Sequence, residues 1–188
     1  MKRCLLPAAI AVALVSALTS QTATAQTTDV RGATDHAEVP RVEGAVARAW
    51  RHVALGDISI PLAPINSRDD IDTVPRHIQG EIKHTDYVIR PAQSPLEIDR
   101  HYEEALRRNG YQTMFVCAGI AACGSRMGEL ILLSDKVSPI GMADGLFNDR
   151  LRVRVARKGA TWVLLHIIQG PDRSLVYQAI VEGARDLD

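Results

Sequence analysis

The chain of 188 residues holds 22 basic and 22 acidic residues, so its formal net charge at pH 7 is zero. Domains that bind nucleic acid in bulk concentrate Lys and Arg, and this balance therefore argues against a nucleic-acid partner. The sequence also has no phosphate-binding glycine loop and no dinucleotide fingerprint, so no motif indicates a cofactor.

The first residues have the three-part pattern of a cleavable signal peptide. Lys2 and Arg3 precede an apolar run over 5–18, and Ala23-Thr24-Ala25 has the small-x-small pattern that signal peptidase cleaves. A membrane-spanning helix needs about 20 apolar residues, and this run ends too early for one. We therefore expect residues 1–25 to be removed on export to the periplasm, which leaves no transmembrane segment.

The 163 residues that follow residue 25 suit one domain with its own core. Positions 26–44 are polar and rich in turn-forming residues, which predicts an extended lead-in over the domain surface. Residues 45–188 are then expected to form a single α+β domain.

The first part of that domain contains extended segments and one loop. Residues 45–54 fit either a helix or a strand, and their alternating pattern favours a strand. Residues 58–62 indicate a short strand, which Pro61 places at a sheet edge. Residues 63–75 predict a loop, and residues 78–90 predict a strand that ends at Pro91.

A helix is predicted from Pro95 to about Asn109. Ser94 supplies an N-cap, Pro95 occupies the first helical position, and Glu97 completes a capping box. Gly110 ends the helix. Apolar residues fall on one side and charged residues on the other, which is typical of an amphipathic helix packed on a sheet.

The second half of the domain is predicted to be mostly strands. Residues 111–118 form a strand that leads into a cysteine-bearing turn over 119–128, and residues 129–133 form another strand. Residues 151–155 alternate as a half-buried strand does, whereas the apolar run 161–168 predicts a central strand covered on both faces. Residues 175–181 close the sheet. The expected fold is α+β: a mainly antiparallel sheet with one long amphipathic helix on one face.

Loss of the signal peptide removes Cys4 and leaves Cys117 and Cys123 in an oxidising compartment, where a disulfide is expected. A loop this short stabilises the fold by only about 2 kcal/mol, so the bond would pin one hairpin-like segment. Metal binding and redox exchange are the alternatives, but zinc needs about four ligands and redox pairs usually have C-x-x-C spacing.

No catalytic or metal-binding constellation is assigned. The six histidines, at 36, 52, 77, 84, 101 and 166, include no H-E-x-x-H motif. His166 lies in the apolar run 161–168, where burial would shift its pKa, and a structural role is favoured over a catalytic one. The segment Cys123-Gly124-Ser125 lacks the rest of a papain-type motif and of a serine-nucleophile motif.

Charged clusters offer one candidate binding site. Arg152 and Arg154 share a strand face and, with Lys158, form a candidate site for anionic envelope polymers or lipids. A solvated sheet face is the simpler interpretation. The cluster at 69, 70 and 72 resembles half of a calcium loop, but it lacks the glycine and the final glutamate of that motif, so a surface loop is preferred.

An ordered set of short motifs resembles a known family. The set comprises DVRGATDH at 29–36, PRVEG at 40–44, SPLEI at 94–98, Tyr102, Ala105-Leu106, Gly110-Tyr111, Cys117 and Cys123-Gly124. The chain resembles the family called domain of unknown function 4892, whose members are envelope proteins, mainly of proteobacteria, some fused to an OmpA-like domain. That resemblance implies a place in the periplasm or outer membrane and no particular reaction. The sequence given contains no OmpA-like domain, so peptidoglycan binding does not carry over.

The sequence therefore predicts an exported envelope protein that acts as a non-enzymatic binding or accessory module, with outer-membrane or cell-wall components as its expected partners. The alternative is a small periplasmic hydrolase whose site uses a histidine, with His166 as the first candidate.

Overall fold

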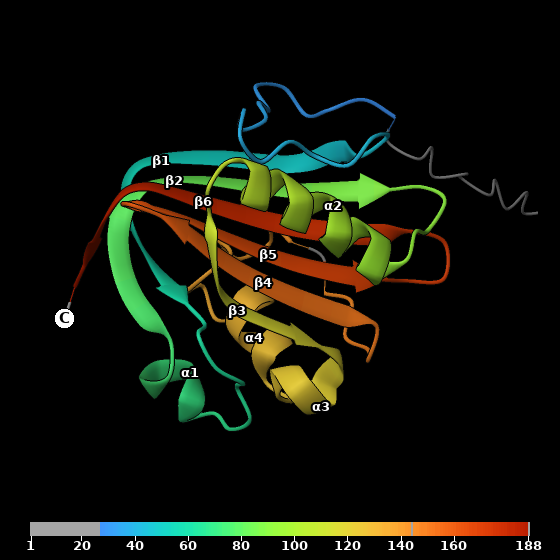
Figure 1. Cartoon of the computed structure of the whole chain (residues 1–188). Helices are drawn as coiled ribbons and strands as arrows, with labels where there is room; N and C mark the ends of the chain where they lie inside the picture. Colours follow the sequence, from blue (N-terminus) through green and yellow to red (C-terminus); the bar gives the residue numbers. More distant parts are fainter. Residues whose placement is uncertain (1–26, 144, 188) are drawn as a thin grey trace, which may run out of the picture.

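A computed structural model describes residues 27–143 and 145–187, and the predicted signal peptide lies outside these residues. Six strands form one sheet in the order β1-β2-β6-β5-β4-β3, and every neighbouring pair is antiparallel (Figure 1). The strands are β1 (Val46–Ile60), β2 (Arg76–Ile89), β3 (Gln112–Ala118), β4 (Leu151–Lys158), β5 (Thr161–Gln169) and β6 (Ser174–Asp186). The expected α+β class with a mainly antiparallel sheet is confirmed.

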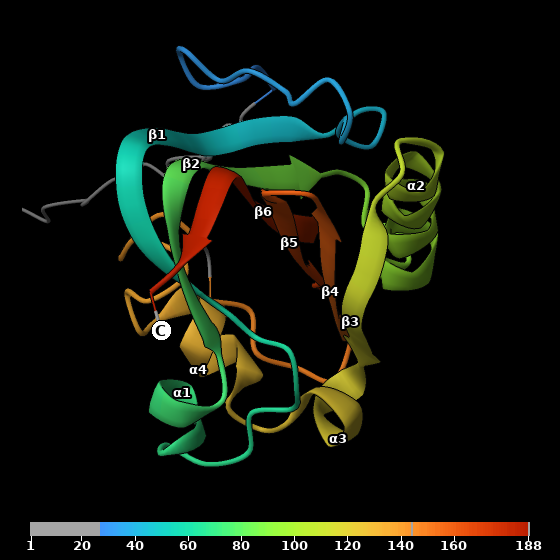
Figure 2. The same cartoon turned by 60° about the vertical axis from the view of Figure 1, so that its left-hand side comes forward.

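Within the described residues, four helices flank the sheet: α1 (Asp70–Thr73), α2 (Pro95–Arg108), α3 (Gly119–Cys123) and α4 (Met127–Leu132). Helix α2 lies on one face against β4 and β5, while α1, α3 and α4 lie on the other, where the sheet curls around α4 (Figure 2). Helix α2 spans 14 residues and begins where the sequence predicts, because Ser94 Oγ accepts the Leu96 N–H and Pro95 needs no partner for its nitrogen.

Each face of the sheet carries its own apolar core. On the α2 face, Ile98, Tyr102 and Leu106 pack against Val163 and Leu165 of β5. On the opposite face, the buried side chains of α4 pack against Trp162 and Leu164. Strand β5 is therefore buried on both sides, which confirms the prediction of a central strand there.

The lead-in segment crosses the α2 face without regular structure. Val39 and Val42 are buried in the core of that face, and the Arg41 guanidinium forms ion pairs with Asp29 and Asp35. The Asp35 carboxylate also accepts a hydrogen bond from Tyr87 of β2 at 2.9 Å. The segment is thus held to the sheet by apolar burial and by a cluster of charged hydrogen bonds.

The structure corrects the prediction of a strand at 129–133, because this segment belongs mostly to helix α4. Leu130, Ile131 and Leu132 are all buried, so the sequence shows a continuous apolar run rather than a helical period. A run of that kind is equally consistent with a buried strand or a short buried helix. Residues 119–128, predicted as a turn, contain α3 and the start of α4.

Two further predictions about strands change in detail. The separate strands at 45–54 and 58–62 are one edge strand, β1, with a register shift between Val53 and Gly56. The segment at 175–181 does not close the sheet: it forms part of β6, which lies between β2 and β5. Strand β6 therefore joins the β1-β2 hairpin to the remaining strands.

The closest approach of two backbone segments near the disulfide is between Gly124 and Ile65. Gly124 has φ of +89°, and a Cβ at this position would overlap the backbone of Ile65. The two segments are joined by hydrogen bonds from Ile65 N–H to Cys123 O at 2.9 Å and from Arg126 N–H to Ile65 O at 2.8 Å. Only glycine permits this approach with this backbone conformation.

Replacing Gly124 by Ala should therefore lower the free energy of unfolding by more than about 3 kcal/mol, since it adds a backbone collision to the conformational cost of a positive φ. Gly44→Ala is the matched control, because Gly44 has φ of +77° and a Cβ there would meet nothing within 4 Å. Its cost should be only about 1 kcal/mol. Urea titrations measure both, and equal costs would contradict the packing role of Gly124.

Candidate functional site

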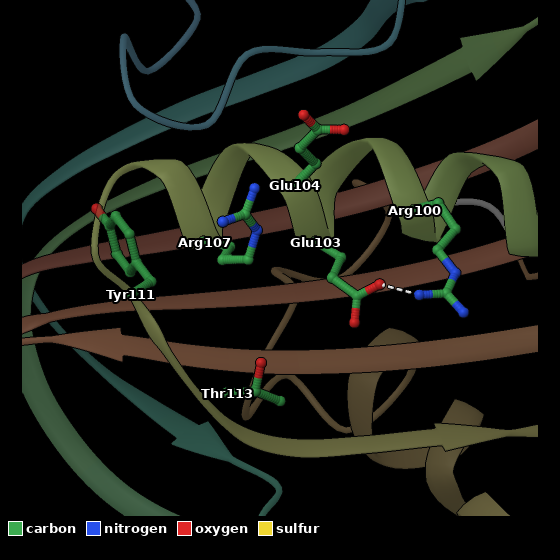
Figure 3. Close-up of a pocket in the computed structure, with 6 residues that line it drawn as sticks. All are labelled: Arg100, Glu103, Glu104, Arg107, Tyr111 and Thr113. Atoms are coloured by element: carbon green, nitrogen blue, oxygen red, sulfur yellow. Dashed lines mark hydrogen bonds and ion pairs between the residues drawn. The ribbon is translucent and has the colours of Figure 1, made fainter.

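A groove of about 540 Å³ lies between helix α2 and edge strand β3 (Figure 3). It is lined by four charged side chains of the helix and by two hydroxyl-bearing residues that follow it: Arg100, Glu103, Glu104, Arg107, Tyr111 and Thr113. In Figure 3 the side chains of Arg100 and Glu103 extend toward β3, where Thr113 lies across from them. The groove is thus bounded by charged side chains of the helix on one side and by a strand edge on the other.

The charges of the groove are unevenly paired. Arg100 binds Glu103 at 2.6 Å, and Glu104 binds Arg108, which lies outside the groove, at 3.2 Å. Among the described residues, the Arg107 side chain has no ion pair and no hydrogen bond. Arg107 is therefore a cation available to an anionic group that enters the groove.

Beneath the groove, α2 is fixed to the sheet by a buried ion cluster. Asp99 is 1% exposed, and its carboxylate accepts hydrogen bonds from Arg154 at 2.6 and 3.0 Å and from Arg152 at 3.0 Å. Glu103 adds a contact to Arg154 at 3.2 Å. Burial alone would lower the pKa of Arg154, but the carboxylates of Asp99 and Glu103 outweigh it and raise that pKa.

These contacts change the interpretation of the three basic residues at 152, 154 and 158. Arg152 and Arg154 do share a strand face, but it is the face covered by α2, and Arg154 is only 3% exposed. Lys158 forms an ion pair with Glu38 of the lead-in segment at 2.6 Å. The three side chains are occupied by carboxylates of the chain itself and do not form an open basic stripe.

Strand β3 has an outer edge that no other described strand pairs with, because it is the last strand of the sheet. Its sequence, QTMFVCA, contains no charged residue and no proline. Met114 and Val116 are 37% and 45% exposed, respectively. Natural edge strands are usually protected by charges, prolines or covering segments, so an uncharged exposed edge is a ready template for another strand.

The opposite edge strand, β1, is covered near both ends. The Val30 N–H donates to Ala47 O at 2.8 Å, and the Ser59 N–H donates to Lys136 O at 2.8 Å. No such backbone hydrogen bond reaches β3 from outside the sheet within the described residues. The two edges therefore differ: β1 receives external backbone hydrogen bonds at Ala47 and Ser59, whereas β3 receives none along its length within the described residues.

The cysteines form the expected disulfide, with their Cα atoms 5.1 Å apart. The bond joins the end of β3 to the end of α3. The helix that follows the edge strand is thereby held against the sheet.

The six histidines do not converge on one site. Four of them form separate pairs: His36 with Glu182, His52 with Glu81, His77 with Ser59, and His101 with the Pro40 carbonyl. In the described ranges, no group of three or more His, Cys, Asp or Glu side chains is arranged to hold a metal ion. The Asp70 carboxylate accepts the N–H groups of Asn66 and Ser67, so it caps its own loop.

The other two histidines are buried in the core around α4. His84 Nδ1 lies 2.7 Å from the Tyr177 hydroxyl, which donates to the Val137 carbonyl, so His84 is the donor of this pair. Burial, with Arg51 nearby, lowers the pKa of His84 to about 4. Burial lowers the pKa of His166 to about 4 as well. Both imidazoles are therefore neutral at pH 7.

Removing the Asp99 carboxylate should strongly destabilise the fold, because the buried Arg154 would keep only the more exposed Glu103 as a carboxylate partner. For Asp99→Ala we expect a loss of about 3 to 5 kcal/mol in the free energy of unfolding. Glu104→Ala removes an exposed ion pair of the same helix and should cost at most about 0.5 kcal/mol. Urea titration of both variants is the measurement, and a loss below about 1 kcal/mol for Asp99→Ala would contradict the anchoring role.

The two buried histidines should make stability depend on pH. An unfolded histidine has a pKa of about 6.5, so between pH 7 and 5 the unfolded chain takes up protons that the folded chain does not. The free energy of unfolding should therefore fall as the pH is lowered, by about 2 kcal/mol per histidine over this range. In His166→Leu, this dependence should weaken by about 2 kcal/mol. Ile168→Val, on the same strand, should lower stability without changing the dependence on pH.

A scan against protein-family models finds none that matches this chain, and a search of curated proteins finds no match. In the described part of the chain, no helix is both long enough and apolar enough to cross a membrane. The assignment of a function therefore depends on the groove and on the open edge of β3.

Proposed function

We propose that the protein is an exported binding module that holds an extended segment of a partner polypeptide along strand β3. The segment would form a seventh strand of the sheet and lie in the groove beneath α2. Its backbone would satisfy the outward N–H and C=O groups of β3, while its side chains would contact the groove and the strand surface. Addition of a strand to an exposed sheet edge is a recurrent mode of peptide recognition.

The observation that carries this proposal is the contrast between the two sheet edges. Strand β1 receives chain segments near both ends, whereas β3 has no external backbone partner among the described residues. The seven residues of β3 are uncharged and leave Met114 and Val116 exposed. An extended segment of about seven residues would match this edge, at roughly 3.3 Å per residue.

Charge indicates the chemistry of the bound segment. Arg100 and Glu103 neutralise each other within the groove, and Glu104 is paired with Arg108. In the described part of the chain, Arg107 is the cation of the groove without a partner, so an acidic side chain or a terminal carboxylate would complement it. We expect the partner segment to alternate apolar residues with at least one acidic residue.

The place of action is part of the same proposal. Residues 1–25 have the pattern of a signal peptide, and the short-range disulfide is of a kind that persists in oxidising compartments. Together with the resemblance to domain of unknown function 4892, these features support the periplasm. The expected partners are polypeptides of the outer membrane or of the cell wall.

The alternative of a histidine-based hydrolase gains no specific support. Among the described residues, His166 has no hydrogen bond or ion pair to a carboxylate that would orient it. The Ser125 hydroxyl donates to the Asn66 carbonyl at 3.1 Å and not to a histidine. A nucleophile and base in contact are the usual sign of such a site.

The proposal is tested by selecting peptides from a random dodecapeptide library displayed on phage against the mature protein. Enriched peptides should be acidic with alternating apolar residues, and their binding should protect backbone amides of β3 in hydrogen exchange. Val116→Lys places a charge where a partner strand would cover it, and should weaken binding at least about tenfold. Arg107→Glu should weaken binding of acidic peptides to a similar extent.

Each variant has a matched control. Leu55→Lys changes an apolar residue that is 68% exposed on the opposite edge strand, and Arg31→Glu makes the same charge change at an exposed arginine of the lead-in segment, away from the groove. Both should leave peptide affinity within about twofold. The proposal fails if no peptide is enriched, if protection maps to β1, or if Val116→Lys binds normally. The proposal is also contradicted if lipid vesicles or sacculi retain the protein and the Val116→Lys variant is retained equally well. It is contradicted as well if light scattering shows that the protein is a dimer and Val116→Lys makes it a monomer, because β3 would then pair with a second copy.

A further inference from the structure

A second cavity, of about 90 Å³, lies on the α4 face of the sheet, away from the groove. Its walls are mainly apolar and are formed by Ile120, Leu146, Phe147, Leu151 and Ile168. These residues come from α3, from the segment before β4, and from strands β4 and β5. The cavity therefore lies where the helices packed on this face meet the central strands.

His166 also lines this cavity, and it differs from the apolar residues around it because its side chain can form hydrogen bonds. The residue is 2% exposed, yet its imidazole has no hydrogen bond and no ion pair to any described residue. Its ring nitrogens are not among the fully enclosed polar atoms that lack a partner in the described residues, so they are accessible from the cavity. A group of this kind that faces a cavity is suited to a ligand that supplies the missing hydrogen bond.

The other polar side chains around the cavity already have partners. The Ser125 hydroxyl donates to the Asn66 carbonyl at 3.1 Å. The Asn148 amide donates to the Gln169 carbonyl at 3.0 Å, and its oxygen accepts the Arg150 N–H at 2.7 Å. His166 is thus the side chain left to recognise a polar atom of a ligand.

The surroundings define the charge of that ligand. The imidazole is neutral at pH 7, since burial lowers the pKa of His166 to about 4, and it offers one N–H donor and one nitrogen acceptor. Among the described residues, the cavity lining contains no charged side chain. An ion would be desolvated there without a counter-charge, which is strongly unfavourable.

The volume of the cavity limits the size of the ligand. Water occupies about 30 Å³ per molecule in the liquid, and an apolar cavity of about 150 Å³ accommodates benzene in another protein. On the benzene scale a cavity of 90 Å³ encloses about four non-hydrogen atoms, and a fifth would extend toward the exposed ring of Phe147. This is the size of a short branched alcohol or ketone.

Two glycines set the position of the outer wall. A Cβ at Gly128 would lie 2.9 Å from the Phe147 ring, and a Cβ at Gly145 would lie 2.7 Å from it. The ring therefore packs directly on these two glycines, although Phe147 remains 55% exposed. Phe147 therefore lines the cavity and is also in contact with solvent, so it marks the side of the cavity nearest the surface.

We propose that this cavity binds a small neutral molecule with a compact apolar body and one hydroxyl or carbonyl group, which forms a hydrogen bond with His166. The apolar body would contact Leu146, Phe147 and Ile168. This inference does not depend on the proposed strand addition at β3, which uses other residues.

Three probes of equal size test the proposal: isobutanol, isopentane and protonated isobutylamine. Each has five non-hydrogen atoms, and they differ only in the group that would meet His166. Isobutanol should bind the mature protein with a Kd between about 10 μM and 10 mM, which is within the limits for so small a ligand. Its binding should shift the NMR signals of the His166 imidazole and the Phe147 ring, while isobutylammonium should bind at least about tenfold more weakly.

Variants separate the hydrogen bond from the shape of the cavity. His166→Leu should weaken isobutanol binding at least about tenfold and change isopentane binding less than about threefold. Leu146→Phe fills the space and should abolish binding of both probes. His101→Leu, on the surface, and Val116→Lys, at the β3 edge, should bind isobutanol as the unmodified protein does.

The inference is overturned if isobutanol causes no shift of the His166 signals up to about 100 mM, which would leave water as the only occupant. Undiminished isobutanol binding by a folded His166→Leu or Leu146→Phe variant would overturn it as well. If His166→Leu weakens the binding of isobutanol and of isopentane equally, the proposed hydrogen bond is ruled out. If isobutylammonium binds as tightly as isobutanol, a preference for a neutral ligand is ruled out.

Discussion

The pairing of β2 with β6 is the contact on which the rest of the sheet depends. Strand β6 lies between the β1-β2 hairpin and the strands β5, β4 and β3, and within the described ranges no other ladder joins these two parts. Its register pairs residues about a hundred positions apart, such as Ile82 with Val181. Closing so long a loop carries an entropic cost that the buried side chains of both faces must offset. Both apolar cores include β6 residues, with Tyr177 on one face and Val176 on the other.

The α2 face depends further on one carboxylate. Asp99 is almost fully buried and forms ion pairs with Arg152 and Arg154 of β4, which ties the helix to the sheet at this point. The position of the helix in turn defines the groove beside β3. Asp99, a charged residue on the otherwise apolar side of α2, thus fixes the helix that forms one wall of the candidate binding site. Arg107, on the side of α2 that faces the groove, has no side-chain partner among the described residues.

The opposite face combines close backbone packing with an incompletely filled interior. Gly124, Gly128 and Gly145 allow backbone and ring contacts that a Cβ would prevent, and the disulfide holds α3 to the end of β3. The cavity beside His166 remains within this packing. An apolar lining and an imidazole that no described residue contacts by a hydrogen bond suit a small ligand, whereas the groove at β3 offers backbone and charge to a polypeptide.

The sequence by itself determined the elements whose signals are local. The start and end of α2 follow from Ser94, Pro95 and Gly110, and the burial of β5 follows from its continuous apolar run. The predicted signal peptide, whose removal would leave two cysteines in an oxidising compartment, indicated the disulfide between Cys117 and Cys123. Capping and apolar periodicity act within a few residues, so they can be recognised without knowing the fold.

Only the tertiary structure decided the features that depend on distant residues. The run at 130–132 became a helix because it is buried on all sides in the curl of the sheet, where strand and helix give the same apolar pattern. Arg152 and Arg154 alternate with apolar residues as solvated residues do, yet Asp99, more than fifty positions away, covers them. The outer edge of β3 has no partner among the described strands because β3 is last in the strand order, and that order is set by long-range pairing that no local pattern encodes.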